Sequence, residues 1–138
     1  MGHPTLIGPV IDAVDVRGVG EFWRELMGLR YRKGDEPPGE GEPDTAAQEW
    51  LVLCDESGRA RLAVQPVDEL PAPTWPAPGV AQQMHLDLMV GSKEELLEQH
   101  DRVLGLGGRV LEDRRDGAEE AIIVFADPAG HPLSLIHI

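Results

Sequence analysis

The sequence predicts an α+β protein made of two copies of one strand–helix–strand–strand–strand (βαβββ) module. The first observation is that strand-like and helix-like hydrophobic patterns follow in the same order in both halves of the 138 residues. The second is that short strings recur: "IDAVDV" parallels "LDLMV", "MGLRY" parallels "LGGRV", and "DESGR" parallels "DPAGH". A repeat of this size indicates two supersecondary units, each too small to bury a sheet alone. We therefore expect two curved mixed sheets of four strands, backed by helices, that enclose a cleft.

The first module is expected at residues 7–67. A strand at residues 10–16 precedes a helix whose apolar stripe at i, i+3, i+4 and i+7 consists of Val19, Phe22, Trp23 and Leu26. Gly28 follows as the stop signal of this helix. The other strands of the module are expected at residues 29–33, 49–55 and 60–67, and the last two form a hairpin.

The segment 34–48, "GDEPPGEGEPDTAAQ", is acidic and rich in glycine and proline. Such a composition predicts a mobile loop without helix or strand. Residues 68–82 form a proline-rich connector that is too stiff and too poor in backbone donors for regular structure.

The second module is expected at residues 83–138. Residues 83–90 predict a strand, and Ser92 with Glu95 forms a capping box that opens a helix. The apolar stripe of this helix consists of Leu96, Leu97, Val103 and Leu104. Three more strands are expected at residues 109–113, 121–127 and 131–138.

Composition excludes several classes of partner. The net charge is −13, from 12 basic and 25 acidic residues, so nucleic acid and anionic membranes are poor partners. The same charge would draw a cationic small molecule toward the protein. No apolar stretch is long enough for a membrane helix, and "MGHPTLIGPV" lacks the pattern of a signal peptide. Cys54 is the single cysteine, which fits a reducing compartment, so we expect a cytoplasmic protein.

The chain resembles the vicinal oxygen chelate superfamily, which has the glyoxalase/bleomycin resistance/dioxygenase fold. The strings that carry the resemblance are "VDVRGVGEFWRELMGLRY", "MHLDLMV", "LGGRVLEDRR" and "FADPAGHPLSL", in this order and spacing across nearly the whole chain. The nearest pattern is that of the glyoxalase-like subgroup frequent in actinobacteria, with "FW" in the first helix and "HLDL" in the fifth strand. The resemblance implies a single domain over residues 1–138 and a homodimer.

The resemblance also implies where a divalent metal would bind, namely on the first, fourth, fifth and eighth strands. The matching positions are Gly8, then one of Arg61, Ala63 and Gln65, then His85, then Ser134. Of the four positions, only the one at His85 keeps a typical ligand. Because Zn²⁺ or Ni²⁺ needs at least three protein donors, we expect no metal and no other cofactor.

Strand alternation predicts which side chains face the cleft. The predicted ligand-binding residues are Asp12, Trp50, Arg61, Gln65, Trp75, His85, Asp87, Met89 and Ser134. Such a mixture of acidic, aromatic and apolar side chains is typical of a small-molecule site. By the repeat, Asp12 and Asp87 are expected at corresponding places in the two modules.

Each of these residues also has a structural interpretation. The two aspartates could bond to backbone or to Arg61, and Arg61 could serve as their salt-bridge partner or as a ligand anchor. His85 could be a buried strand histidine, a ligand contact, a residual metal ligand or a catalytic base. Trp75 could pack or act as a lid. If His85 is a base, Asp12 is expected to orient its ring more readily than Asp87, because strand neighbours at i and i+2 lie about 6–7 Å apart.

Two classes of function follow from the sequence. The first is a metal-free protein that sequesters a small organic ligand, cationic or aromatic, as antibiotic-binding members of the superfamily do. The second is an enzyme of the glyoxalase, lyase or isomerase type that uses His85 as a base or metal ligand. A module that binds other proteins is a third alternative.

Overall fold

The structure is a computed structural model and is described for residues 2–138. The chain forms two compact units, the first ending at Leu70 and the second comprising Pro71–Ile138. Each unit holds one α-helix and a mixed sheet of four strands, which confirms the predicted α+β fold of two modules. Neither described helix is long and apolar enough to cross a membrane.

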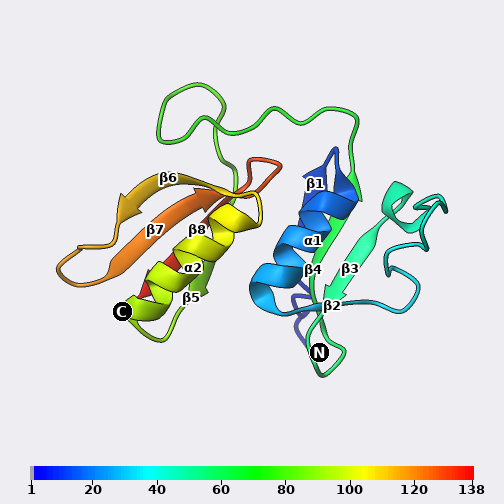
Figure 1. Ribbon diagram of the computed structural model, residues 1–138, viewed down its shortest axis with the longest axis horizontal. Coiled ribbons are helices and arrows are strands. Elements are labelled where there is room, and N and C mark those ends of the chain that lie inside the picture. The colour runs from blue at the N-terminus through cyan, green and yellow to red at the C-terminus, as the bar shows by residue number, and fades with distance from the viewer. Residues whose placement is uncertain (1) are drawn as a thin grey trace. The chain divides into compact units, whose positions relative to one another are not determined.

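The first unit contains β1 (Val10–Ala13), α1 (Val16–Met27), β2 (Arg30–Tyr31), β3 (Leu51–Cys54) and β4 (Ala60–Pro66). Its strand order is β1-β4-β3-β2, with β1 parallel to β4 and the other pairs antiparallel. Figure 1 shows α1 lying along this sheet. The predicted stripe Val19, Phe22, Trp23 and Leu26 is buried, and the Phe22 and Trp23 rings meet edge to face.

Helix α1 begins earlier than its apolar stripe suggested. The Asp15 carboxylate accepts a hydrogen bond from the Gly18 N–H at 3.0 Å, so Asp15 is the N-cap and the preceding strand ends at Ala13. The expected strand over residues 10–16 was therefore too long. Gly28 ends the helix in the left-handed conformation, as its residue type predicts.

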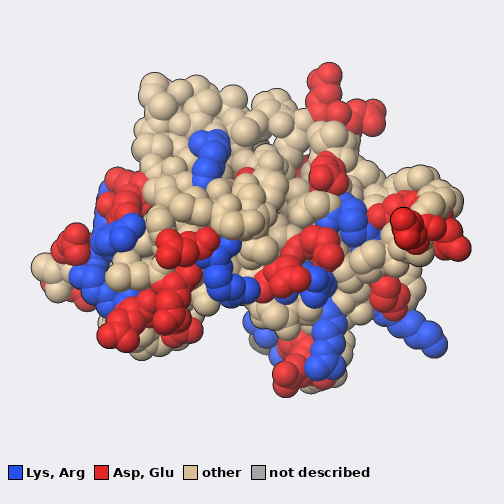
Figure 2. Space-filling model, viewed as in Figure 1, with Lys and Arg blue, Asp and Glu red and all other residues tan. Residues whose placement is uncertain are grey.

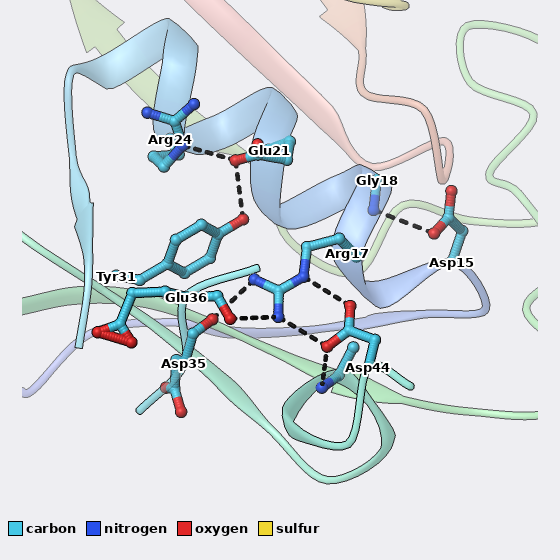
Figure 3. A network of polar contacts seen from close by, with 10 residues as sticks. Asp15, Arg17, Gly18, Glu21, Arg24, Tyr31, Asp35, Glu36 and Asp44 are labelled. Carbon is cyan, nitrogen blue, oxygen red and sulfur yellow. Dashed lines mark hydrogen bonds and ion pairs between the residues drawn. The ribbon is translucent and has the colours of Figure 1, made fainter. Parts of the chain in front are cut away.

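The acidic segment 34–48 is fastened to α1 by Arg17 (Figure 3). The guanidinium donates to both carboxylate oxygens of Asp44, at 2.7 and 2.8 Å, and to the Asp35 carbonyl oxygen at 2.7 Å. The hydrogen bond with Asp44 raises the pKa of Arg17, and the bond from Arg17 lowers the pKa of Asp44. The segment also contains a short 3-10 helix, Ala46–Gln48, so the prediction that it holds no helix was wrong.

Tyr31 joins the same network (Figure 3). The Arg17 guanidinium lies 4.8 Å from the centre of the Tyr31 ring, and the Tyr31 hydroxyl donates to Glu21 at 2.9 Å. Burial, together with its contact to Glu21, raises the pKa of Tyr31 to about 12. These contacts stabilise a loop that has too few apolar residues to fold by burial.

The second unit contains β5 (Leu86–Met89), α2 (Lys93–Gly105), β6 (Arg109–Arg114), β7 (Ala121–Ala126) and β8 (Pro132–His137). Its strand order, β5-β8-β7-β6, repeats that of the first unit. Ser92 is the N-cap of α2 and accepts from the Glu95 N–H at 3.0 Å, as the capping box predicted. Leu96 and Val103 of this helix are fully buried, whereas Leu97 and Leu104 are exposed, so the expected stripe was too wide.

The connector residues 71–82 form no helix or strand, as predicted. Thr74 and Val80 nevertheless close a turn, because the Thr74 N–H donates to the Val80 carbonyl oxygen and the Val80 N–H donates to the Thr74 hydroxyl, both at 2.9 Å. Nearby, Ala72 lies against Gly130 in the β7–β8 turn, where a larger residue would have no room for its Cβ. The connector is therefore folded onto the second unit rather than extended.

Candidate ligand-binding site

One face of the second sheet is free of α2 and carries the candidate site. Hydrogen-bonded register aligns Asp87, Ser134, Val124 and Glu112 in a row that crosses all four strands. A second row consists of Met89, Ile136, Ile122 and Arg114. Because side chains alternate along a strand, the residues between them point to the opposite face. Between the two rows, Ile123 of β7 and Leu135 of β8 are buried on the other face, and their strand neighbours Phe125 and Leu133 are buried with them.

A cavity of about 380 Å³ lies over this face, a volume in the range of small-molecule sites. Its floor is apolar, formed by Ile122, Val124 and Ile136. Trp75 and Gln82 of the connector complete the wall. The remaining lining residues are polar or charged: His85, Asp87, Glu112, Arg114, Glu120 and Ser134.

The charges around the cavity are unbalanced. Three carboxylates, those of Asp87, Glu112 and Glu120, stand against the single guanidinium of Arg114, which donates to Glu112 at 2.9 Å. With His85 neutral, the lining has two negative charges in excess. This local excess has the same sign as the net charge of −13, and Figure 2 shows many acidic side chains on the face in view.

His85 and Asp87 lie side by side at one edge of the cavity. The His85 Nε2 atom is 3.3 Å from the Asp87 Oδ1 atom, and both side chains are about half exposed, at 48% and 56%. Asp87 therefore approaches the ring closely, although strand neighbours at i and i+2 were expected to lie about 6–7 Å apart. His85 precedes the first residue of β5, so its side chain can turn toward Asp87 instead of standing parallel to it.

Gln82 brings an unusual polar atom to the cavity wall. Its Oε1 atom is buried, and among residues 2–138 it is the only buried side-chain oxygen or nitrogen without a hydrogen-bond partner. A buried acceptor without a partner is costly, and in native proteins such groups frequently mark a place where another molecule binds.

The structure brings together four of the nine predicted ligand-binding residues, namely Trp75, His85, Asp87 and Ser134. Met89 lies on the same strand but is 79% exposed and does not line the cavity. The other four, Asp12, Trp50, Arg61 and Gln65, belong to the first unit.

In the first unit the predicted residues make their own contacts. The Gln65 side-chain amide donates to the Asp12 carboxylate at 2.6 Å, across the β1–β4 pair. Arg61 lies 3.5 Å from Asp55 in the β3–β4 turn. Its neighbouring carboxylate is therefore that of Asp55, whereas Asp12 or Asp87 had been expected. Trp50 immediately precedes β3, and its N–H donates to the Ala46 carbonyl oxygen.

The two units correspond at a separation of 77 residues. Asp15 and Ser92 cap the two helices at this separation. The parallel strand pairs β1–β4 and β5–β8 give the same alignment. Val10 is the first paired residue in β1 and lies opposite Ala63, and Asp87, 77 residues later, lies opposite Ser134. Asp87 therefore corresponds to Val10, and Asp12 corresponds to Met89. The expectation that Asp12 and Asp87 are equivalent was wrong by two residues, since the "IDAVDV" and "LDLMV" strings match in letters but not in register.

The metal positions implied by the resemblance do not form a metal centre. Gly8 corresponds to His85, but a Cβ atom at Gly8 would lie 2.6 Å from the Arg61 carbonyl oxygen, so the backbone of β4 occupies the space of a ligand side chain. Ser134 offers a neutral hydroxyl and corresponds to Ala63, which offers nothing. Within the described residues, no three His, Cys, Asp or Glu side chains converge on one point. The donor set does not fit a divalent cation.

Sequence reasoning missed most of the sheet face. Glu112, Arg114, Glu120, Ile122, Val124 and Ile136 line the cavity but were not predicted to do so. Alternation along β7 offered a weak signal, because Ile122 and Val124 share a face. The signal was not decisive, since their neighbours Ile123 and Phe125 are also apolar.

Repeated mixed sheets and a cavity on one of them define a two-module α+β protein with a candidate small-molecule site. A family model described as "Glyoxalase-like domain" matches residues 9–136. The chain belongs to this family, within the vicinal oxygen chelate superfamily. No curated protein matches it by sequence.

Solved structures support the same fold. The fosfomycin resistance protein FosX from Listeria monocytogenes is 17% identical with a TM-score of 0.70, over 99% of this chain and 93% of that one. A glyoxalase/bleomycin resistance protein/dioxygenase family enzyme from Burkholderia phytofirmans is 11% identical with a TM-score of 0.66, over 94% of both chains. A glyoxylase/bleomycin resistance protein/dioxygenase domain from Frankia is 12% identical with a TM-score of 0.66, over 98% of this chain and 92% of that one. At these identities the similarity concerns the fold.

Proposed function

We propose that this protein binds a small organic cation with an apolar or aromatic body, without a metal ion. The observation that carries the proposal is the lining of the cavity in the second unit, where three carboxylates and one guanidinium surround an apolar floor and Trp75. Carboxylates attract the charge of a cation, and the indole and aliphatic side chains bury its body. Sequestration of a toxic cation is the biological role that this chemistry suits.

Similarity to fosfomycin resistance proteins does not by itself point to fosfomycin as the ligand. Fosfomycin is a phosphonate anion, and a lining with two excess negative charges repels an anion. The proposal therefore separates this chain from those structural relatives by the sign of the charge that it binds.

Calorimetric titration with a matched pair of probes tests the proposal. Phenyltrimethylammonium and benzenesulfonate share a ring and differ in the sign of the charge. We expect measurable affinity for the cation and none for benzenesulfonate or fosfomycin. Equal or tighter binding of either anion would refute the proposal, as would stoichiometric Ni, Zn, Mn or Fe in the purified protein.

Tryptophan fluorescence locates the binding site. Trp75 lines the cavity, whereas Trp50 lies in the first unit. The cation is expected to change the emission of the native protein and of Trp50→Phe, but not of Trp75→Phe. A signal that persists in Trp75→Phe and disappears in Trp50→Phe would place binding elsewhere.

Acid–base catalysis is a second candidate function, favoured by the 3.3 Å approach of Asp87 to His85. A carboxylate beside an imidazole holds the ring in one orientation and stabilises its protonated form, as a general base requires. If the protein is an enzyme, the bound cation is converted over time, which proton NMR detects. His85→Ala would then abolish conversion, whereas in a binding protein it would only alter the affinity.

A further inference from the structure

We infer that the ligand of this cavity carries two positive charges separated by an apolar span. This inference rests on the proposed function and specifies the class of cation. It follows from how the carboxylates are distributed over the sheet face, and not from their number alone.

Two of the three carboxylates of the cavity lie at opposite edges of one sheet. Asp87 is on β5 and Glu112 is on β6, the two outer strands, and both belong to the same hydrogen-bonded row. Three strand spacings separate them, which is about 14 Å between backbones. Between the two edges the floor is formed by Ser134, Val124, Ile136 and Ile122, three of them aliphatic.

With His85 neutral, the two excess negative charges lie apart on the sheet face. At the β5 edge, Asp87 lies 3.3 Å from His85. In the β6–β7 hairpin, Glu112 pairs with Arg114 at 2.9 Å, and Glu120, which immediately precedes β7, adds a further carboxylate to the lining, so one carboxylate charge is left over. A ligand with one charge can compensate only one of these excesses, whereas a dication of matching length compensates both.

The connector provides a second and independent sign of a ligand. Trp75 offers an apolar ring for the body of a long molecule, and the buried Gln82 Oε1 atom has no hydrogen-bond partner. A surface evolved only for solubility would not bury an acceptor in this way. Both residues come from the connector and extend the wall of the cavity above the sheet.

Bis-trimethylammonium alkanes measure the span between the two charges. We expect affinity to rise from the tetramethylene to the decamethylene compound, because only the longer chain reaches both edges. The control is 10-hydroxydecyltrimethylammonium, which has the same chain length but one neutral end. The decamethylene dication should bind about fivefold tighter than this control at low salt, the value expected for one half-exposed ion pair. Added salt should reduce the advantage.

Variants of the cavity carboxylates test which of them binds each charged end of the dication. Asp87→Asn and the double variant Glu112→Gln/Glu120→Gln should each lower the affinity for the dication to that of the hydroxyl control. The affinity for the control itself should change by no more than about twofold, because a monocation can use the remaining edge. Arg114→Gln should strengthen dication binding. Glu94→Gln, on the exposed surface of α2, is the matched control and should change nothing.

The outcomes separate this inference from the proposed function. If the dication and its hydroxyl control bind equally at every chain length, the inference is overturned while the proposed binding of organic cations stands. If neither compound binds and phenyltrimethylammonium does not bind either, the proposed function itself is refuted. A dication advantage that survives Asp87→Asn and the double glutamate variant would also overturn the inference.

Discussion

The two units share one fold but place their polar residues in opposite rows. In the first unit, the polar pair Asp12–Gln65 joins β1 to β4, and the row beside it holds Val10 and Ala63. In the second unit, the corresponding rows are reversed: Asp87 and Ser134 are polar, while Met89 and Ile136 are apolar.

Buried positions, by contrast, are apolar in both units. Val19 and Leu96, Leu26 and Val103, and Val64 and Leu135 are corresponding pairs, and all six residues are buried. The comparison teaches that the helix side of each sheet specifies the fold, because it must exclude water. The other side is free to diverge, and in the second unit it has become a cavity lining.

The helices differ most between the two units, and substitutions in them are expected to have the largest effect on stability. Trp23 is fully buried and corresponds to His100, which remains 20% exposed beside Phe125. Trp23→Ala should cost about 3–5 kcal/mol of unfolding free energy. His100→Ala should cost about 1 kcal/mol. Urea denaturation followed by circular dichroism measures both changes in unfolding free energy. Equal losses would show that this position contributes equally to the stability of both units.

Gly8 and His85 occupy corresponding positions in the two units, and exchanging these residue types tests how much space each position leaves for a side chain. Gly8→His should destabilise the protein by about 2 kcal/mol, because the new Cβ meets the Arg61 carbonyl oxygen. His85→Gly should cost less than about 1 kcal/mol. Thermal unfolding measures the two changes. Full stability of Gly8→His, with new Ni²⁺ binding in a calorimetric titration, would contradict the account of the lost metal position.

The Arg17–Asp44 pair has no counterpart in the second unit, where Glu94 corresponds to Arg17. Asp44→Asn should cost about 1 kcal/mol at pH 7. Because Arg17 lowers the pKa of Asp44, this stabilisation is present above the ordinary pKa of 3.8 and is lost as pH falls through the lower folded value. Native protein and variant should therefore converge in stability once the pH is below the folded pKa of Asp44. A difference that persists there would assign the effect to something other than the ion pair.

The smallest effect on stability is expected at the cavity. Asp87→Asn should change the unfolding free energy by less than about 0.5 kcal/mol, because its side chain is 56% exposed. Asp12→Asn should cost more, since the carboxylate is half-buried and bonded to Gln65. Thermal unfolding of the two variants compares them. Equal losses would imply that Asp87, like Asp12, has a structural role.

Much of the fold could be predicted from local patterns. The stripe in α1, the Ser92 capping box and the Gly28 stop each reflect interactions between residues close in sequence, and the structure confirms them. Strand ends were less well predicted, because a cap such as Asp15 ends one element and starts the next at the same residue. The 3-10 helix of Ala46–Gln48 was missed because neither its composition nor its length gives a periodic signal.

The candidate site was predicted only in part, for a physical reason. His85, Asp87 and Ser134 were found from strand alternation and from family resemblance, both of which can be read along the chain. Glu112 and Arg114 join them through the register of β6 with β7 and of β7 with β8, and Glu120 directly precedes β7. Register depends on turn geometry and bulges, such as the one between Val110 and Glu112, and no local pattern reports it.

By itself, the sequence determined two repeated modules, an acidic net charge, and residues at positions 8 and 134 (Gly8 and Ser134) that are poor metal ligands. These follow from residue identity and from periods of two and 3.6 residues, which any short segment carries. Only the tertiary structure decided that Asp87 faces Glu112 across a strip of aliphatic side chains, and that Asp12 corresponds to Met89. Those relations join residues far apart in the chain, and hydrogen-bonded strand pairing is what brings them together.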